Sequence, residues 1–302
     1  MKVLVTGGTG FAGREILREL HRAAHEIYFL SRRGHSAVCY AIEEEFSGEL
    51  CSGDVLDSKS LPEACAGMDV IIHLVGIISE VGRQTFENVH TLGTQNIVKA
   101  AQKTGVRRFI HMSALGTRPN TVSRYHKSKW AAEEIVRNSG LDWTIFRPSI
   151  IYGRGDGFVN LFAKIIRRSP IVPILGMGQT KFQPMPVESV ASAFVKALNK
   201  PEAIRQTYDL CGPKTFTLNE IVDEISTALK RKRLKVHVPF ALARCQAALL
   251  EFIFGKLLHK PPPLNRDQVL MLQEDNIGNG KPAAELFELK PGSFREGIAR
   301  YL

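Results

Sequence analysis

Tyr125 and Lys129 are the residues of this sequence whose types and spacing point most directly to chemistry. They form the pattern YxxxK within RYHKSKWAAEEIVRNS, a run that predicts a helix. On a helix this spacing places both side chains on one face. The lysine ammonium could then hold a nicotinamide ribose and lower the pKa of the phenol, so that the tyrosine exchanges a proton with a substrate oxygen while hydride moves. Because YxxxK is common by chance, the alternative is a tyrosine and a lysine on a solvated helix.

That chemistry needs a nucleotide, and the start of the chain offers a place for one. The sequence MKVLVTGGTGFAG predicts a strand, a turn containing Gly7, Gly10 and Gly13, and a helix beginning near Phe11. Gly7 would allow a tight turn, Gly10 would let the backbone approach a pyrophosphate, and Gly13 would let the helix lie close to the strand. The unpaired N–H groups and the dipole of the helix N-terminus favour negative charge there. The alternative is a glycine turn without a ligand.

Two arginines follow the second predicted strand and indicate which dinucleotide is preferred. The strand HEIYFL ends at Ser31, and Arg32 and Arg33 come next, with no acidic residue nearby. In this architecture an acidic residue at that point binds the ribose 2′-hydroxyl of NAD, whereas an arginine accommodates the 2′-phosphate of NADP. We therefore expect NADP(H) rather than NAD(H). If both arginines are merely solvated at the end of the strand, the preference stays open.

The order of the predicted elements indicates how these residues are brought together. Strands and helices alternate over residues 1–152, which predicts an α/β fold with a doubly wound parallel sheet and helices on both faces. Ligands of such sheets lie at the carboxyl ends of the strands, so Leu74, Val75 and Gly76 would pass the adenosine ribose, and Pro148 would end a further strand at the same edge. We expect residues 184–200 to return to this domain, and residues 153–183 and 201–302 to form a smaller, discontinuous substrate lobe.

Composition narrows the class of protein. The chain has 302 residues and a net charge of +10, which fits a polyanionic partner, anionic lipid, or a phosphate-bearing cofactor together with solvated lysines. No basic stripe with interleaved aromatic residues is present, so we expect no nucleic-acid partner. The five cysteines are scattered and form no CxxC pair, which supports neither a metal site nor a disulfide framework. The first predicted strand begins at Lys2, so we expect no signal peptide and a cytoplasmic protein, with contact to the inner membrane as an alternative.

An apolar run near the C-terminus has two interpretations. Residues 240–259, FALARCQAALLEFIFGKLLH, form a helical pattern with a wide apolar arc, and three charges within the run argue against a transmembrane span. We expect this arc to be the core of the substrate lobe or an oligomer contact. The alternative is a membrane surface or a lipophilic substrate, with Lys256 and Lys260 helping the contact.

Four segments together resemble the atypical and extended short-chain dehydrogenase/reductases, in particular those related to the 39-kDa accessory subunit of respiratory complex I. The segments are TGGTGFAG, FENVHTLGTQNIVKAAQKTGVRRFIHMSALG, YHKSK and FRPSIIYGRGDGFVN. The resemblance is close over residues 1–215 and loose beyond them. It implies a Rossmann domain that binds NADP(H), with the following residues at the pyrophosphate: Thr9, Gly10, Phe11 and Ala12. It further implies Arg32 at the 2′-phosphate, Asp54 and Val55 beside the adenine, and Tyr125 and Lys129 at the nicotinamide ribose. For Asp54 the alternative is a turn or helix cap.

The same resemblance exposes one departure. Extended members carry a catalytic Ser or Thr at the position of Ala114, and Ser113 is a hydroxyl one place early, where a strand side chain points the opposite way. Ser113 is therefore an uncertain helper to Tyr125. We expect an oxidoreductase acting on a carbonyl, enone or quinone-like small molecule. The alternatives are a non-catalytic nucleotide-binding partner of a respiratory complex or of quinone synthesis and, third, a nucleotide-sugar epimerase or dehydratase.

Overall fold

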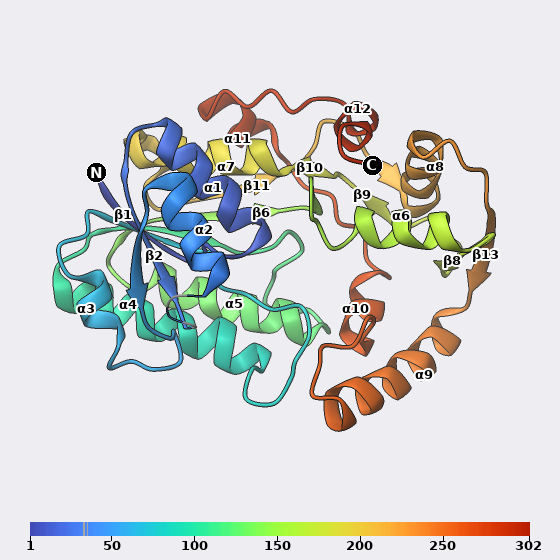
Figure 1. Ribbon diagram of the computed structural model, residues 1–302, viewed down its shortest axis with the longest axis horizontal. Helices are drawn as coiled ribbons and strands as arrows, with labels where there is room; N and C mark the ends of the chain where they lie inside the picture. Colours follow the sequence, from blue (N-terminus) through green and yellow to red (C-terminus); the bar gives the residue numbers. More distant parts are fainter. Residues whose placement is uncertain (33, 35) are drawn as a thin grey trace.

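A seven-stranded parallel sheet forms the centre of the computed structural model, which describes residues 1–32, 34 and 36–302 (Figure 1). Arg33 lies outside the described residues. The strand order is β11-β6-β5-β4-β1-β2-β3, so the direction of winding reverses between β1 and β4. The strands are β1 (Lys2–Thr6), β2 (Glu26–Ser31), β3 (Glu49–Ser52), β4 (Val70–His73), β5 (Arg108–Met112), β6 (Asp142–Pro148) and β11 (Gln206–Leu210). The predicted doubly wound α/β fold is confirmed.

Helices cover both faces of this sheet because its strands are apolar on both sides. In β1, Val3 and Val5 face one core while Leu4 faces the other, and all three are fully buried. The first core is closed by α1 (Phe11–Arg22), α2 (Ala37–Phe46), α7 (Val187–Lys196) and α11 (Lys281–Leu286). The second is closed by α3 (Leu61–Cys65), α4 (Gly93–Thr104) and α5 (Arg124–Arg137). A π-helical turn, Glu87–Leu92, leads into α4.

A separate hydrophobic core holds the smaller lobe together. It contains Phe182 and Phe216 with the apolar faces of three helices. The helices are α6 (Val159–Arg168), α8 (Leu218–Ala228) and α12 (Phe294–Ala299), and the strand pairs of this half are β7 (Ile151–Tyr152) with β10 (Met185–Pro186), β8 (Ile171–Leu175) with β13 (Leu234–Val238), and β9 (Lys181–Phe182) with β12 (Phe216–Thr217). The capping box at Thr217 and Glu220 fixes the start of α8.

The division of the chain into two lobes stays a prediction, but one strand lies in the main sheet and not in the smaller lobe to which its residues were assigned. Residues 201–302 were expected in the smaller lobe, yet β11 extends the main sheet by pairing in parallel with β6 from Gln206 to Leu210. Phe287, just after α11, is also fully buried in the core of the main sheet. The backbone N–H and C=O groups along the outer edge of β6 need partners, and a segment remote in the sequence supplies them.

The apolar run near the C-terminus forms α9 (Phe240–Leu250), continued by a π-helical stretch, Glu251–Leu257. Only Ala243 and Ala247 of this helix are buried, against α10 (Arg266–Met271). Phe240 also packs against this small cluster, but Leu242, Leu249 and Phe252 of the arc are exposed. The expectation that the wide apolar arc forms the core of a lobe is therefore wrong, and the oligomer contact stays a prediction. Among the described residues, no helix combines the length and the apolarity needed to cross a bilayer.

Candidate nucleotide site

A cavity of about 490 Å³ lies at the carboxyl ends of β1, β2 and β4, where the strand order reverses. This is the position at which doubly wound sheets bind their ligands. Of the residues predicted to contact a cofactor, those that line this cavity are Gly7, Thr9, Gly10, Phe11, Ala12, Gly13, Ser31, Arg32, Asp54, Val55, Leu74, Val75 and Gly76. Tyr125, Lys129, Ser113 and Pro148 do not line it.

The glycine turn has the geometry that a phosphate cradle requires. Gly7 adopts a φ of +81°, and its carbonyl accepts the N–H of Gly10 at 3.0 Å. A Cβ on Gly13 would lie 2.3 Å from the Gly7 oxygen, whereas a Cβ on Gly10 would meet only that same oxygen and otherwise open space. The first turn of α1 contains no acidic residue, and no side chain caps its N–H groups. The residues present therefore fit the pyrophosphate of a dinucleotide.

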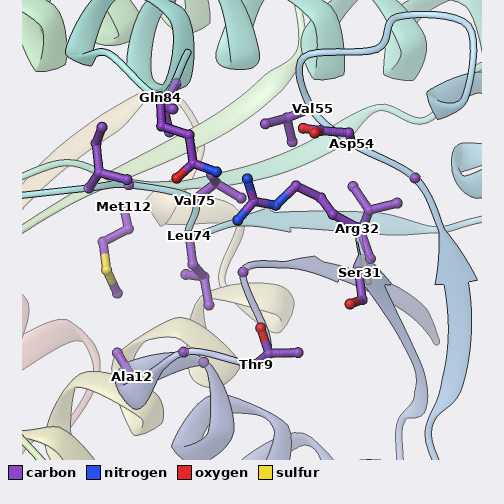
Figure 2. Close-up of a pocket in the computed structure, with 18 of the residues that line it drawn as sticks. Thr9, Ala12, Ser31, Arg32, Asp54, Val55, Leu74, Val75, Gln84 and Met112 are labelled. Atoms are coloured by element: carbon purple, nitrogen blue, oxygen red, sulfur yellow. The ribbon is translucent and has the colours of Figure 1, made fainter. Parts of the chain in front are cut away.

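Arg32 extends from the end of β2 across the cavity towards Gln84, which lies in the loop after β4 (Figure 2). With the Gln84 amide turned so that its oxygen faces the guanidinium, both terminal nitrogens of Arg32 donate to that oxygen. The Arg32 side chain is exposed, so it is free to reorient towards an anion. Sequence reasoning found Arg32 but missed Gln84, because nothing local links a loop residue to a strand 52 positions earlier.

Asp54 stabilises its own turn through hydrogen bonds. Its Oδ1 accepts the N–H of Leu56 at 2.9 Å, while its own N–H donates to Ser60 Oγ. The alternative role as a turn cap is therefore present, and the second carboxylate oxygen is left for a ligand because Asp54 also lines the cavity. Further lining residues that the sequence analysis did not single out are Leu30, Ser36, Val38, Gly53, Leu56, Ile77, Gln84, Val89 and Met112. Met112 ends β5, and its place at the carboxyl end of a strand was a usable signal.

Lys129 reaches the rim of the cavity from α5. Its ammonium donates to the Met112 carbonyl at 3.0 Å, and a Cβ on Gly76 would lie 3.2 Å from Nζ. Since Met112 and Gly76 both line the cavity, the ammonium lies immediately behind its wall. Burial lowers the pKa of Lys129 to about 8, against the opposing effect of Glu133. The lysine therefore remains mostly charged at neutral pH.

Tyr125 lies one layer further from the cavity. Its ring meets the rings of Phe86 and His90 edge to face, with the ring centroids 5.8 and 5.3 Å away. The backbone N–H of Tyr125 donates to the Asp267 carboxylate. Burial, and then the Asp267 charge, raise the pKa of Tyr125 to about 12. We expected Lys129 to lower this pKa, but desolvation of the phenolate dominates here. The phenol is thus neutral at physiological pH.

His90 connects the tyrosine to the cavity wall, and the sequence carried no signal for it. Its Nε2 accepts the N–H of Ile77 at 3.0 Å, so the proton resides on Nδ1, which donates to Ser128 Oγ at 2.8 Å. Ser128 Oγ in turn donates to the Tyr125 carbonyl. Burial and the nearby Lys129 charge lower the pKa of His90 to about 2, which keeps its imidazole neutral.

Two more buried histidines lie behind Lys129. His73 bonds Thr6 Oγ1 at 2.6 Å and Thr94 Oγ1 at 3.1 Å, whereas neither ring nitrogen of His111 has a hydrogen-bond partner in the described part of the chain. The two rings stack with centroids 5.5 Å apart. Burial, and then the Lys129 charge, lower the pKa of His73 to about 3 and that of His111 well below its usual value. Lys129 is thus the charged group of this cluster.

Ser113 makes a different contact from the one expected of a helper to Tyr125. Its hydroxyl donates to Glu133 Oε1 at 2.5 Å, and the fully buried Glu133 carboxylate also pairs with Arg147 at 2.6 Å and with Arg137 at 2.5 Å. The hydroxyl is therefore committed to an ion-pair network beneath the end of β5. Pro148 is buried at the end of β6, where it pairs in register with Leu210.

Comparison with known proteins agrees with this architecture. The chain is 30% identical over 283 residues to "NADH dehydrogenase [ubiquinone] 1 alpha subcomplex subunit 9, mitochondrial" of Arabidopsis thaliana, covering 90% of this chain and 70% of that protein. It is 31% identical over 199 residues to the ceramide reductase of Caulobacter vibrioides, covering 66% of this chain and 61% of that protein. These relatives confirm the resemblance to atypical short-chain reductases and complex I subunits.

Solved structures and a family description complete the comparison. The dTDP-glucose 4,6-dehydratase DesIV of Streptomyces venezuelae, solved with NAD bound, superposes with a TM-score of 0.75 at 21% identity, covering 100% of this chain and 95% of that chain. At this identity the match shows a shared fold. The sequence model described as "NAD dependent epimerase/dehydratase family" matches residues 3–211, which include the glycine turn, the cavity and the YxxxK pair. This chain therefore belongs to the NAD-dependent epimerase/dehydratase family.

Proposed function

We propose that this protein is an NADP(H)-dependent oxidoreductase that reduces a carbonyl, enone or quinone-like group of a small molecule. The observation that carries the cofactor assignment is Arg32. Among the described residues lining the cavity it is the one Lys or Arg, and it lies at the end of β2, where a ribose 2′-substituent is bound in this architecture. A guanidinium suits a phosphate at that position better than a hydroxyl.

Different residues around the cavity would bind different parts of the cofactor. The N–H groups at the start of α1, with Gly10 beside them, would hold the pyrophosphate, and Arg32 would hold the 2′-phosphate. The Lys129 ammonium, beside Gly76, would donate to the hydroxyls of the nicotinamide ribose. When bound, the nicotinamide supplies the hydride.

Tyr125 would then complete the reduction. Because its pKa is raised to about 12, the phenol is protonated at neutral pH and donates its proton to the substrate oxygen as negative charge develops there. At neutral pH the phenolate, which would accept the proton in the reverse reaction, is scarcely populated. His90 would hold the backbone at Tyr125 in place relative to the cavity wall, because it bonds the Ile77 N–H on one side and Ser128, which donates to the Tyr125 carbonyl, on the other.

A second function is favoured by one specific observation. The Ser113 hydroxyl is bound by the buried Glu133, and the next residue is Ala114, so neither position offers a free hydroxyl beside the substrate. Together with the similarity to a complex I subunit, this supports a nucleotide-binding protein that acts as a partner of a respiratory complex without turnover.

Calorimetry and single-turnover kinetics test both proposals. We expect purified protein to bind NADPH and to oxidise it in the presence of some member of a panel of carbonyls, enones and quinones. Tyr125→Phe should lower that rate about 100-fold or more without changing the affinity for NADPH. Tyr208→Phe, which removes a phenol on β11 away from the cavity, is the matched control. Tight NADPH binding with no oxidation across the panel would favour the non-catalytic function, and absence of binding to either dinucleotide would overturn both.

A further inference from the structure

The outer face of α9 and its continuation carries large apolar side chains in contact with solvent. Leu242 is 61% exposed, Leu249 59% and Phe252 54%, and Leu257 and Leu258 at the end of the helix are also more than half exposed. Leu242, Leu249 and Phe252 are spaced seven and three residues apart, so they lie on one side of the helix. The opposite side, with Ala243 and Ala247, packs against α10. Figure 1 shows α9 at the margin of the molecule, away from the central sheet.

Positive charge is concentrated in the stretch of chain that leads into this helix and contains it, with Arg244, Lys256 and Lys260 on the helix or at its end. Residues 230–260 contain eight Lys and Arg residues and a single acidic residue, Glu251, in a chain whose net charge is +10. Glu251 is neutralised by Arg266 from outside the segment, with 2.7 Å between Oε2 and Nε. In the described part of the chain, Lys235 is the one basic residue of the segment that pairs with a carboxylate, that of Asp223. Lys256 and Lys260 are exposed beside the apolar side chains of the helix.

We propose that this outer face docks onto the surface of an anionic lipid bilayer. A helix that turns Leu and Phe outward between basic residues can bury its apolar side chains at the level of the acyl chains, while Lys and Arg reach the lipid phosphates. Each basic residue near an anionic surface strengthens binding about fivefold. A second copy of this chain is a poorer occupant, because it would bring the same excess of positive charge against itself. This proposal does not depend on the nucleotide chemistry.

Sedimentation of the full chain with vesicles tests it. We expect the protein to sediment with vesicles of phosphatidylcholine mixed with phosphatidylglycerol, not with phosphatidylcholine alone, and to be released by added salt. Replacing Leu249 and Phe252 together with glutamine should lower the partition coefficient about tenfold or more. The matched control replaces Val122 and Leu161 with glutamine, since both are exposed apolar residues outside the segment. Circular dichroism of each variant checks that it is folded.

The charge contribution has its own variant. Lys256→Gln combined with Lys260→Gln should weaken binding to the mixed vesicles about 25-fold, whereas Lys103→Gln, on the exposed side of α4, should leave binding unchanged. A fluorophore attached to Cys245, which is exposed on the same helix, should brighten on addition of mixed vesicles.

Three results would overturn the proposal. The first is folded protein that sediments with neither kind of vesicle, which would point to an acidic protein partner instead. The second is equal binding to both kinds of vesicle, which would remove the role of charge. The third is a loss of binding in the Val122 and Leu161 variant as large as that in the helix variant.

Discussion

Replacing Arg32 with alanine removes the side chain on which the choice between NADP(H) and NAD(H) depends. We expect the backbone of β2 and the glycine turn to stay as they are, because the Arg32 side chain is exposed and extends into the cavity (Figure 2). The variant therefore isolates one guanidinium.

The size of the effect follows from the contacts of that guanidinium. Hydrogen bonds to a charged group contribute about 1.5–3 kcal/mol, and the exposure of Arg32 places its contribution at the lower end of this range. In the free protein Arg32 already donates to Gln84, so binding a 2′-phosphate exchanges a contact worth about 1 kcal/mol. The net loss on Arg32→Ala is then about 0.5–1 kcal/mol, or roughly two- to fivefold in the dissociation constant for NADPH.

Titration calorimetry with both dinucleotides measures this difference. We expect the Kd for NADPH to rise roughly two- to fivefold and the Kd for NADH to stay the same, because NADH lacks the 2′-phosphate. Gln84→Ala is the control. It removes the competing contact without removing positive charge, so it should leave NADPH binding unchanged or tighter.

Two results would refute this reasoning. If Arg32→Ala weakens NADPH and NADH by the same factor, the arginine contributes to the shape of the cavity and not to recognition of the 2′-phosphate. If Gln84→Ala weakens NADPH as much as Arg32→Ala does, the two side chains act together on the nucleotide, and the exchange described above does not occur.

Three further predictions concern the cradle, the buried ion pairs and the lysine. Gly13→Ala should lower the free energy of unfolding, measured by urea denaturation, by about 1–3 kcal/mol, since the new Cβ would lie 2.3 Å from the Gly7 oxygen. Gly157→Ala is the control and should be neutral, since nothing lies within 4 Å of its Cβ. Similar values for both variants would contradict the close packing of α1 on the turn. Glu133→Gln should cost about 3 kcal/mol because it leaves the partly buried Arg147 guanidinium without its carboxylate partner. Glu134→Gln, whose side chain is 46% exposed, should cost little, and equal shifts in thermal unfolding for the two variants would contradict a stabilising role of the Glu133 ion pairs. The pKa of Lys129 is lowered to about 8 from its ordinary value of 10.5, so between these two pH values the unfolded chain binds more protons than the folded chain. The free energy of unfolding should therefore rise with pH from 8 to 10, by up to roughly 1.4 kcal/mol per pH unit, relative to Lys129→Met. Parallel pH profiles for the two proteins would show that the ammonium is not desolvated.

The sequence alone determined the features that depend on residues close together in the chain. The spacing of Gly7, Gly10 and Gly13 identified the strand, turn and helix of the cradle, because tight turns and close helix packing each restrict a single position to glycine. The alternation of strands and helices predicted the doubly wound sheet, and the ends of β2 and β4 placed Arg32 and Gly76 at its carboxyl edge. The spacing of Tyr125 and Lys129 likewise predicted a shared helix.

Tertiary structure decided which distant groups meet and which faces are covered. Whether the Ser113 hydroxyl faces a substrate or Glu133, and whether Arg32 meets Gln84, depends on where remote segments pass. The pairing of β11 with β6 is non-local in the same way. For α9, the residue pattern showed which side chains share a side, but only packing showed that α10 takes the alanine side and leaves Leu249 exposed. Periodicity fixes directions about one element's own axis, whereas burial depends on what the rest of the chain places against it.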